Sequence, residues 1–378
     1  MKINKLSFND KSLEWSLESI SFDKLTLLVG ASGVGKTQIL KAILALKNIA
    51  NGESISGIFW DVEFETISGE VYRWNGEFEN KGYQFIDDDD DSDKNKPKIL
   101  NETVSVNGKE IIKRSISETY FNDQKTLKFS SQESVLNILK EEDQIKPAFE
   151  DFKKLIFSDQ ADSQKEPFKL SIFNASKLTK KYTTLKSIQE SDEDVRVKLY
   201  LVYKNDEKTF NNIKERFTEI FPQVEGLKIE PLDFKNEEMP SFLIDYPFIQ
   251  IKEIGVENWI QQGKISSGMF RTLIHISEMY LCPEGTVFLI DEFENSLGIN
   301  CIDELTNDII NSNREIQFII TSHHPYIINN IHYSKWKLVT RKSGVVKTHN
   351  LEKYNIGKSK HDSFMQLMQL EEYQTGLE

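Results

Sequence analysis

Cysteine is scarce in this 378-residue sequence, which contains only Cys282 and Cys301. Two cysteines cannot build the disulfide framework of a small secreted domain or an all-cysteine zinc site. The sequence also lacks an apolar run of about 20 residues, which excludes a transmembrane helix. Its opening residues lead into an alternating strand pattern and not into the apolar core of a signal peptide. We therefore expect a cytoplasmic protein with no membrane partner.

The sequence also has fewer basic than acidic residues. It contains 47 Lys and Arg and 60 Asp and Glu, which gives a net charge of −13. This excess disfavours a protein that coats nucleic acid by bulk charge, although a local basic groove is compatible with it. Hydrophobic residues make up 38% of the chain and include 24 Phe. The chain is therefore long and apolar enough to bury a sizeable core in two or three domains of ~100–200 residues.

Both ends of the chain have the pattern of an α/β fold. Residues 24–29 are mostly apolar, residues 30–35 are rich in glycine, and residues 37–46 have apolar positions at helical spacing. This order predicts a strand, a glycine loop and a helix. Near the other end, the sequence predicts two buried strands, a closing hairpin and a short helix, at residues 286–290, 316–321, 335–348 and 361–372.

The middle of the chain begins with β-like segments. Residues 56–130 contain short alternating runs and an Asn107-Gly108 turn, so we predict an antiparallel β subdomain there. The acidic run Asp87 to Asp91 lies within this stretch. It is interpreted as a solvated loop, with a metal site as the alternative.

Residues 131–245 are predicted to form a mainly helical insertion lobe. Helical spacing and the stops at Pro147 and Pro222 predict helices at residues 132–145, 149–157 and 209–220. The α/β core is then expected to comprise residues 1–55 and 246–378.

A phosphate-binding motif follows the first apolar run. Gly30-Ala31-Ser32-Gly33-Val34-Gly35-Lys36-Thr37 matches G-x-x-x-x-G-K-[ST] in full, between a predicted strand and a predicted helix. Its glycines let backbone N–H groups surround a β-phosphate, and the start of the helix adds its positive dipole end. Lys36 is expected to bridge the β- and γ-phosphates of ATP, and the Thr37 hydroxyl to coordinate Mg²⁺.

Two adjacent acids end the apolar run at residues 286–290. Asp291 would face the Mg²⁺ shell from the carboxyl end of the strand. A bend of the chain at this point would let Glu292 polarise the water that attacks the γ-phosphate, as general base. A polar loop after a core strand is the alternative, which the phosphate loop disfavours.

Three further segments carry a family resemblance. Residues 264–271 contain Ser266-Ser267-Gly268 and Arg271, the Ser-Ser-Gly-x-x-Arg form of the ABC signature. Residues 292–297 read Glu-Phe-Glu-Asn-Ser-Leu, and residues 319–325 contain Thr-Ser-His-His-Pro. Together they resemble the compact ABC-type AAA ATPases, whose heads are similar to those of RecF and chromosome-maintenance proteins. Many members of that group belong to anti-phage defence modules, including overcoming-lysogenisation-defect, Septu and retron-linked ATPases.

The resemblance implies a P-loop NTPase fold with the architecture of an ABC-ATPase head, and a mechanism that uses two heads. Ser267-Gly268 of one subunit would close over the γ-phosphate held by Lys36 of the other. Asn295-Ser296-Leu297 would cross the interface between them. His323 would sense or stabilise the γ-phosphate, and a capping or core role is the alternative for His324.

Some features of the family have no clear match in this sequence. Gln132 is the first candidate for the glutamine that supplies a further Mg²⁺ ligand in this family, with Gln84 and Gln124 behind it. No sustained heptads separate the phosphate loop from the signature, which disfavours a long coiled-coil arm. The stretch after Pro325 is too short for the nuclease domain of overcoming-lysogenisation-defect proteins. A nuclease or toxin effector is therefore expected on a separate chain.

These motifs favour an ATP-driven switch. ATP-dependent formation of a homodimer or higher homo-oligomer would control the effector, in anti-phage defence. The alternative is a DNA-repair or DNA-end-binding ATPase, which leaves nucleic acid open as a partner. The energy subunit of a transporter is disfavoured by the long insertion and by the Glu-Asn-Ser-Leu segment. A scaffold that binds nucleotide without hydrolysing it is the remaining alternative.

Overall fold

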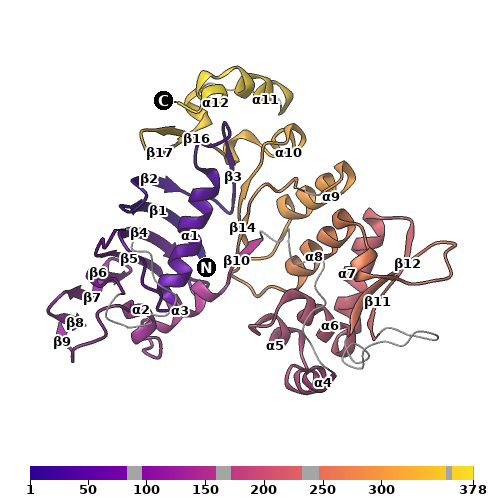
Figure 1. Cartoon of the computed structure of the whole chain (residues 1–378), viewed down its shortest axis with the longest axis horizontal. Helices are drawn as coiled ribbons and strands as arrows, with labels where there is room; N and C mark the ends of the chain where they lie inside the picture. Colours follow the sequence, from indigo (N-terminus) through magenta and orange to yellow (C-terminus); the bar gives the residue numbers. More distant parts are fainter. Residues whose placement is uncertain (83–95, 159–171, 232–246, 296, 355–359, 378) are drawn as a thin grey trace. The chain divides into compact units, whose positions relative to one another are not determined.

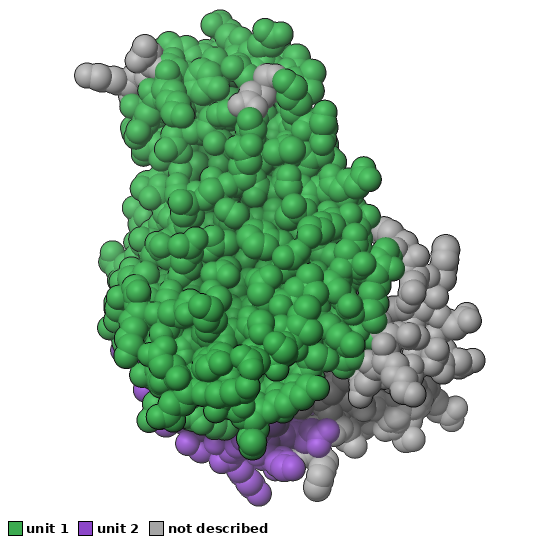
Figure 2. All heavy atoms as spheres, turned by 90° about the vertical axis from the view of Figure 1, so that its left-hand side faces the viewer, with its two compact units in different colours: residues 1–158, 284–293, 310–378 green, residues 159–283, 294–309 purple. Residues whose placement is uncertain are grey.

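A computed structural model describes residues 1–82, 96–158, 172–231, 247–295, 297–354 and 360–377. The chain divides into two compact units (Figure 2), unit 1 with residues 1–158, 284–293 and 310–378, and unit 2 with residues 159–283 and 294–309. The acidic run Asp87 to Asp91 lies outside the described residues. None of the described helices is long and apolar enough to cross a membrane.

The strands of unit 1 form one mixed sheet in the described part of the chain (Figure 1). Its fourteen strands follow the order β10-β14-β15-β3-β16-β17-β2-β1-β4-β5-β6-β7-β8-β9. The strands are β1 (Lys2–Asp10), β2 (Trp15–Ser21), β3 (Leu25–Val29), β4 (Ile58–Glu65), β5 (Val71–Phe78), β6 (Ile99–Val106), β7 (Lys109–Ser115), β8 (Thr119–Phe121), β9 (Gln124–Lys125), β10 (Leu155–Ser158), β14 (Val287–Ile290), β15 (Gln317–Thr321), β16 (Trp336–Lys342) and β17 (Val345–Asn350). The helices of unit 1 are α1 (Lys36–Ala50), α2 (Val135–Ile138), α3 (Lys146–Lys153), α10 (Pro325–Asn330), η2 (Tyr333–Lys335), η3 (Leu351–Tyr354), α11 (Lys360–Gln369) and α12 (Glu371–Thr375).

One end of this sheet is parallel. β10, β14, β15, β3 and β16 run parallel to one another. Every residue of β14 and β15 is buried, as expected for strands covered on both faces. Because the strands are parallel, their carboxyl ends lie at one edge, and the loops that follow β3, β14 and β15 meet there. The predicted strands at residues 24–29, 286–290 and 316–321 are confirmed.

The other end of the sheet is antiparallel. β4 alternates between buried and half-buried residues, and the predicted Asn107-Gly108 turn joins β6 to β7 with positive φ at both residues. These strands were expected to form a separate subdomain. However, β4 pairs with β1 along its whole length, so the antiparallel strands continue the sheet of the core.

Aromatic side chains fill the core beneath the antiparallel strands. Trp60 and Trp74 are fully buried, with ring centroids 5.2 Å apart. Phe152 of α3 packs edge-on against Trp74 and Phe64, at 5.2 and 5.1 Å. Each contact of this kind adds ~0.5–1.5 kcal/mol beyond the burial of its area. Helix α3 is therefore held to unit 1 and not to a helical insertion.

The predicted helices at residues 132–145 and 149–157 differ from the structure. The first region contains only the short α2, and the second forms the end of α3 and then β10. Pro147 lies in the first turn of α3, where its missing N–H costs nothing, and does not end a helix. Because β10 joins the parallel strands, the boundary of unit 1 falls at residue 158 and not at residue 130.

Unit 2 is mainly helical and carries a small sheet. Its elements are α4 (Ile172–Lys181), α5 (Leu185–Gln189), α6 (Val195–Asn205), α7 (Glu207–Ile220), β11 (Val224–Glu230), β12 (Phe248–Glu253), β13 (Ile260–Gln261), η1 (Gln262–Lys264), α8 (Ser267–Leu281) and α9 (Ile299–Ile310). Helix α7 confirms the prediction for residues 209–220. Helix α8 packs against α6 and α7, so the signature segment belongs to this unit and not to the α/β core.

A buried ion pair ties the outer strands of unit 1 to α2. Glu102 of β6 has no exposed surface and lies 3.4 Å from Arg114 of β7, whose side chain is also buried. Glu102 also accepts hydrogen bonds from Trp74 Nε1, Ser134 Oγ and the N–H of Val135, at 2.9, 2.6 and 3.0 Å. Burial raises the pKa of Glu102, and these donors oppose that rise.

Replacing Arg114 by Met is expected to destabilise the protein by about 3–5 kcal/mol, because it leaves a buried carboxylate without its cation. Without Arg114 the pKa of Glu102 rises further, because one of the groups that oppose the rise is gone. A carboxyl group whose pKa is raised by folding stabilises the folded state less as the pH rises, so the deficit should be larger at about pH 8 than at about pH 5. Urea unfolding at the two pH values measures both effects. The control is Arg73→Met, which removes an exposed pair with Asp61 and should cost less than ~1 kcal/mol. Equal losses for the two variants would contradict the prediction.

Candidate nucleotide-binding site

The phosphate-loop motif forms the turn between β3 and α1. Gly30 lies so close to β16 that a Cβ there would be 2.5 Å from the carbonyl oxygen of Val339. Only glycine fits that position. Ser32 and Gly33 are exposed, and a Cβ on Gly33 would meet nothing within 4 Å. The loop is therefore held on its β16 side and open at its tip.

The Lys36 side chain turns back over this loop. Its Nζ donates hydrogen bonds to the carbonyl oxygens of Gly30 and Ala31, at 3.0 and 2.8 Å, and the residue is 6% exposed. A buried ammonium group held by backbone carbonyls at the start of a helix is placed to exchange them for the oxygens of an anion.

Asp291 connects the phosphate loop to the neighbouring strands. Its Oδ2 accepts a hydrogen bond from the Thr37 hydroxyl at 2.8 Å, and its Oδ1 accepts one from the Thr321 hydroxyl at 2.6 Å. β15 pairs with both β14 and β3, so the residue after β14 lies beside the end of β15 and close to α1. The structure therefore brings together Thr37 and Asp291, as the sequence predicted, and adds Thr321.

The chain bends sharply after Asp291. Glu292 has φ +45°, in the left-handed region that side chains other than glycine rarely adopt. The bend is held by hydrogen bonds from the N–H of Glu292 to the Thr321 hydroxyl and from the N–H of Phe293 to the Thr321 carbonyl, at 2.8 and 3.1 Å. It leaves the Glu292 side chain exposed at the same edge of the sheet. Strained backbone of this kind concentrates at functional sites.

The donors at this edge suit a magnesium ion. The Thr37 hydroxyl and the Asp291 carboxylate are hard oxygen ligands within hydrogen-bond distance of each other. Among the described residues, no three His, Cys, Asp or Glu side chains come together to hold a metal on their own. Two protein oxygens supplemented by phosphate and water are the ordinary way in which Mg²⁺ is bound beside a nucleotide.

The two histidines after β15 differ in their surroundings. His324 caps α10, because its Nδ1 accepts the N–H of Tyr326 at 3.3 Å, and Pro325 occupies the first turn. The capping alternative for His324 is thus confirmed. His323 is partly exposed and directly follows the Thr321-Ser322 segment.

The signature residues lie at the start of α8, in unit 2. Ser266 is the N-cap, and its hydroxyl accepts the N–H of Met269 at 3.3 Å. Ser267 is exposed on the first turn, with Gly268 next to it. Arg271 is buried, and its Nε lies 3.4 Å from Nε2 of His275.

The segment expected at the subunit interface also belongs to unit 2, at the start of its second stretch of chain, residues 294–309. Leu297 donates its N–H to the carbonyl of Glu294 at 3.0 Å, and Asn295 lies within that turn. Ser296 lies outside the described residues.

The structure contradicts the prediction that Gln132 is a magnesium ligand. Its neighbours Glu133 and Asn137 lie against Gly52, just beyond the end of α1. The phosphate loop precedes the start of that 15-residue helix, about 22 Å away. Gln124 lies on β9, at the far edge of the sheet from β14, and Gln84 lies outside the described residues.

Sequence reasoning missed Thr321 and β10. Thr321 is 1% exposed, yet its hydroxyl both donates to Asp291 and accepts from Glu292. Its position at the end of an apolar run, directly before Ser-His-His-Pro, was the available signal. β10 was hidden because Leu155–Ser158 continues the apolar spacing of α3.

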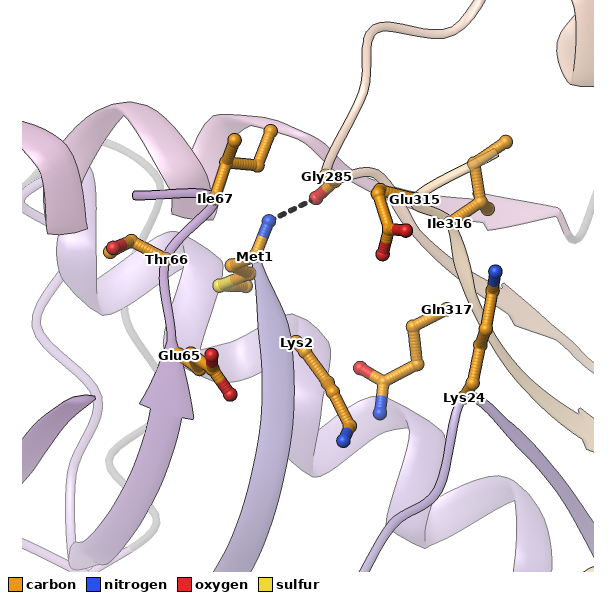
Figure 3. A pocket seen from close by; sticks show the side chains of 10 residues that line it. All are labelled: Met1, Lys2, Lys24, Glu65, Thr66, Ile67, Gly285, Glu315, Ile316 and Gln317. Atoms are coloured by element: carbon orange, nitrogen blue, oxygen red, sulfur yellow. Dashed lines mark hydrogen bonds between the residues drawn. The ribbon is translucent and has the colours of Figure 1, made fainter. Parts of the chain in front are cut away.

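A pocket of about 340 Å³ lies elsewhere in unit 1 (Figure 3). It is lined at the starts of β3, β14 and β15, whereas the phosphate loop follows the end of β3. Its lining residues are Met1, Lys2, Lys24, Glu65, Thr66, Ile67, Gly285, Glu315, Ile316 and Gln317. The pocket therefore lies at the amino ends of the parallel strands, and the nucleotide site lies at their carboxyl ends.

Comparison with known proteins agrees with this geometry. A protein-family model described as "AAA domain, putative AbiEii toxin, Type IV TA system" matches residues 25–329. The chain is similar in fold to an Smc head bound to the C-terminal winged-helix domain of ScpA, with 16% identity, a TM-score of 0.54 and coverage of 94% of this chain and 99% of that one. It is also similar to an Smc head with an extended coiled coil bound to the C-terminal domain of ScpA from Pyrococcus furiosus, with 15% identity, a TM-score of 0.52 and coverage of 94% and 98%. The comparison with curated proteins returned no match.

Replacing Thr321 by Val is expected to destabilise the protein by about 1–3 kcal/mol, because it removes the acceptor of the partly buried N–H of Glu292 and one donor to Asp291. Thr321→Ser keeps the hydroxyl and is the matched control. Urea unfolding of the two variants measures the difference. A Val variant as stable as the Ser variant would show that the hydroxyl does not hold the bend.

Proposed function

The chain belongs to this AAA-domain family, and we propose that it binds and hydrolyses ATP with Mg²⁺ and uses ATP-dependent dimerisation to switch a partner protein. The observation that carries this proposal is the pair of hydrogen bonds that joins the Thr37 hydroxyl to Asp291 and Asp291 to Thr321. These bonds hold a carboxylate directly beside a phosphate-loop motif, which supports a role for Asp291 in binding Mg²⁺.

The phosphate loop would hold the nucleotide. The backbone N–H groups of residues 30–37 surround the phosphates, with the open tip at Ser32 and Gly33 as the entry. Lys36 exchanges the carbonyls of Gly30 and Ala31 for β- and γ-phosphate oxygens. The ammonium group has hydrogen-bond acceptors before and after this exchange, so it is not left buried without a partner in either state.

Hydrolysis needs a base on the γ-phosphate side. Glu292 is assigned this role because the bend at its positive φ turns it away from the strand direction and leaves it exposed beside Asp291. His323 follows the next strand at the same edge and is assigned to the γ-phosphate. Thr37 and Asp291 would hold Mg²⁺, which neutralises charge on the phosphates when bound.

The second half of the site would come from another subunit. Ser267 and Gly268 begin α8, so their N–H groups and the helix dipole provide donors for a triphosphate. Ser267 is exposed, as a residue that contacts a second copy must be before closure. Arg271 is assigned to the signature and Asn295-Ser296-Leu297 to the interface. ADP lacks the γ-phosphate oxygens, so closure would depend on ATP.

The partner is proposed to be a separate nuclease or toxin in anti-phage defence. The family description names the AbiEii toxin and a toxin–antitoxin system, and a system of this kind has two components, which supports a role alongside a separate protein. The two Smc heads are seen with a domain of ScpA bound, which supports the view that such heads dock other proteins. ATP-driven closure would then be read by the docked chain.

Glu292→Gln is expected to bind ATP with near-normal affinity and to hydrolyse it about 10²–10⁴-fold more slowly, because it loses one general base. Phosphate release and equilibrium binding of a fluorescent ATP analogue separate the two effects. Lys36→Ala is the contrasting variant and should lose tight binding. Normal turnover by the Gln variant would remove Glu292 from the mechanism, and unchanged affinity of the Ala variant would remove the phosphate loop.

Light scattering of Glu292→Gln with Mg-ATP is expected to show twice the mass seen without nucleotide. Adding Ser267→Arg should abolish this doubling, because a long cation would block the surface at the start of α8, while binding of ATP by each subunit persists. The matched control is Ser117→Arg, at an exposed serine of the β7–β8 turn. A dimer that survives Ser267→Arg would refute the assignment of the signature.

A further inference from the structure

Three later segments of unit 1 support the phosphate loop. Val339 of β16 lies under Gly30, and Val346 of β17 lies 2.9 Å from where a Cβ on Gly35 would be. The third support is Gly376, which directly follows α12. A Cβ on Gly376 would lie 2.3 Å from Cγ1 of Val34 and 3.2 Å from Cβ of Ala31. The α12 turn, residues 370–377, thus packs directly on the loop.

The backbone of Gly376 is held firmly in this position. It adopts the left-handed conformation, with φ +72°, and its N–H donates to the carbonyl of Glu372 at 3.0 Å. Its own carbonyl accepts the N–H of Arg341, on β16, at 2.8 Å. Helix α12 packs on β16, and α11 packs on both α12 and α10 (Figure 1). The turn is therefore anchored to the same strand that lies under Gly30.

The contact with Gly376 leaves Val34 only 4% exposed, whereas the neighbouring Ser32 and Gly33 are exposed. The backbone of residues 31–34 is thereby restrained on its outer side by an apolar contact. A loop that binds phosphate through its N–H groups depends on this backbone being held in place before the ligand arrives.

We propose that Gly376 is a positioning residue for the phosphate loop, acting through Val34 to hold the backbone of residues 31–34 ready for nucleotide. This inference rests on the proposed function, because it assumes that the loop binds ATP. It predicts that the α12 turn sets the affinity for ATP and does not take part in the hydrolysis step.

Gly376→Ala tests this directly. The added Cβ cannot coexist with Val34 at 2.3 Å, so the turn or the loop must shift, and the affinity for an ATP analogue should fall about tenfold. The KM for ATP should rise in proportion while kcat at saturation stays unchanged. The matched control is Gly108→Ala. Gly108 has a similar φ of +81°, but a Cβ there meets nothing within 4 Å.

A double-mutant cycle identifies the contact. In a Val34→Ala background, Gly376→Ala should change the affinity by less than about twofold, because the clashing methyl group is gone. If Gly376→Ala lowers the melting temperature more than Gly108→Ala does, the affinity for the ATP analogue is measured with Gly376→Asn instead. Asn tolerates the left-handed conformation and still adds a Cβ.

Affinity of Gly376→Ala or Gly376→Asn equal to that of Gly108→Ala would overturn the proposal. So would a lower kcat with an unchanged KM, or the same tenfold loss in the Val34→Ala background. These outcomes leave ATP binding by the unaltered chain intact. Failure of the proposed function would instead appear as no binding by the unaltered chain, or as binding that Lys36→Ala leaves unchanged.

Discussion

The carboxylate of Asp291 joins the parts on which the candidate site depends. One oxygen accepts the hydroxyl of Thr37, at the start of α1, and the other accepts the hydroxyl of Thr321, at the end of β15. The three residues are brought together because β15 lies between β14 and β3 in a parallel sheet. Thr321 also restrains the chain after Asp291, because its hydroxyl accepts the N–H of Glu292 and so holds the bend. A shift of any one strand would therefore move Asp291, Glu292 and the phosphate-loop motif together.

The phosphate loop is also supported by elements that follow β15 in the chain. Its glycines allow close approach of backbone, and the segments that approach are β16, β17 and the α12 turn, about 300 residues later in the chain. The loop thus lies between strands whose carboxyl ends carry the candidate site residues and later elements that pack on its outer side. This arrangement supports preorganisation, in which the cost of ordering the loop is met by folding and not by ligand binding.

Patterns that depend on neighbouring residues predicted much of this structure. The apolar runs of β3, β14 and β15, the Asn107-Gly108 hairpin and helix α7 follow from local spacing, and the structure confirms them. The predictions of secondary structure were wrong where packing against a segment far away in the sequence decides the conformation. Leu155–Ser158 has helical spacing but becomes a strand because β14 offers a parallel partner at the sheet edge. Pro147 begins a helix because Phe152 of that helix can pack on Trp74 and Phe64. Gln132 was proposed as a ligand from its residue type alone. Its neighbours lie beyond the carboxyl end of α1, whereas the phosphate loop precedes the start of that helix.

By itself, the sequence determined the phosphate loop, the acid pair at residues 291 and 292, and the α/β class, because each is encoded by residues adjacent in the chain. Only the tertiary structure decided that Thr321 bridges Asp291 to Glu292, that β4 to β9 continue the core sheet, and that Gly376 packs on Val34. These are contacts between residues far apart in the sequence. They depend on which strands pair and which backbones approach closely, and those choices minimise the free energy of the whole sheet and not of any one segment.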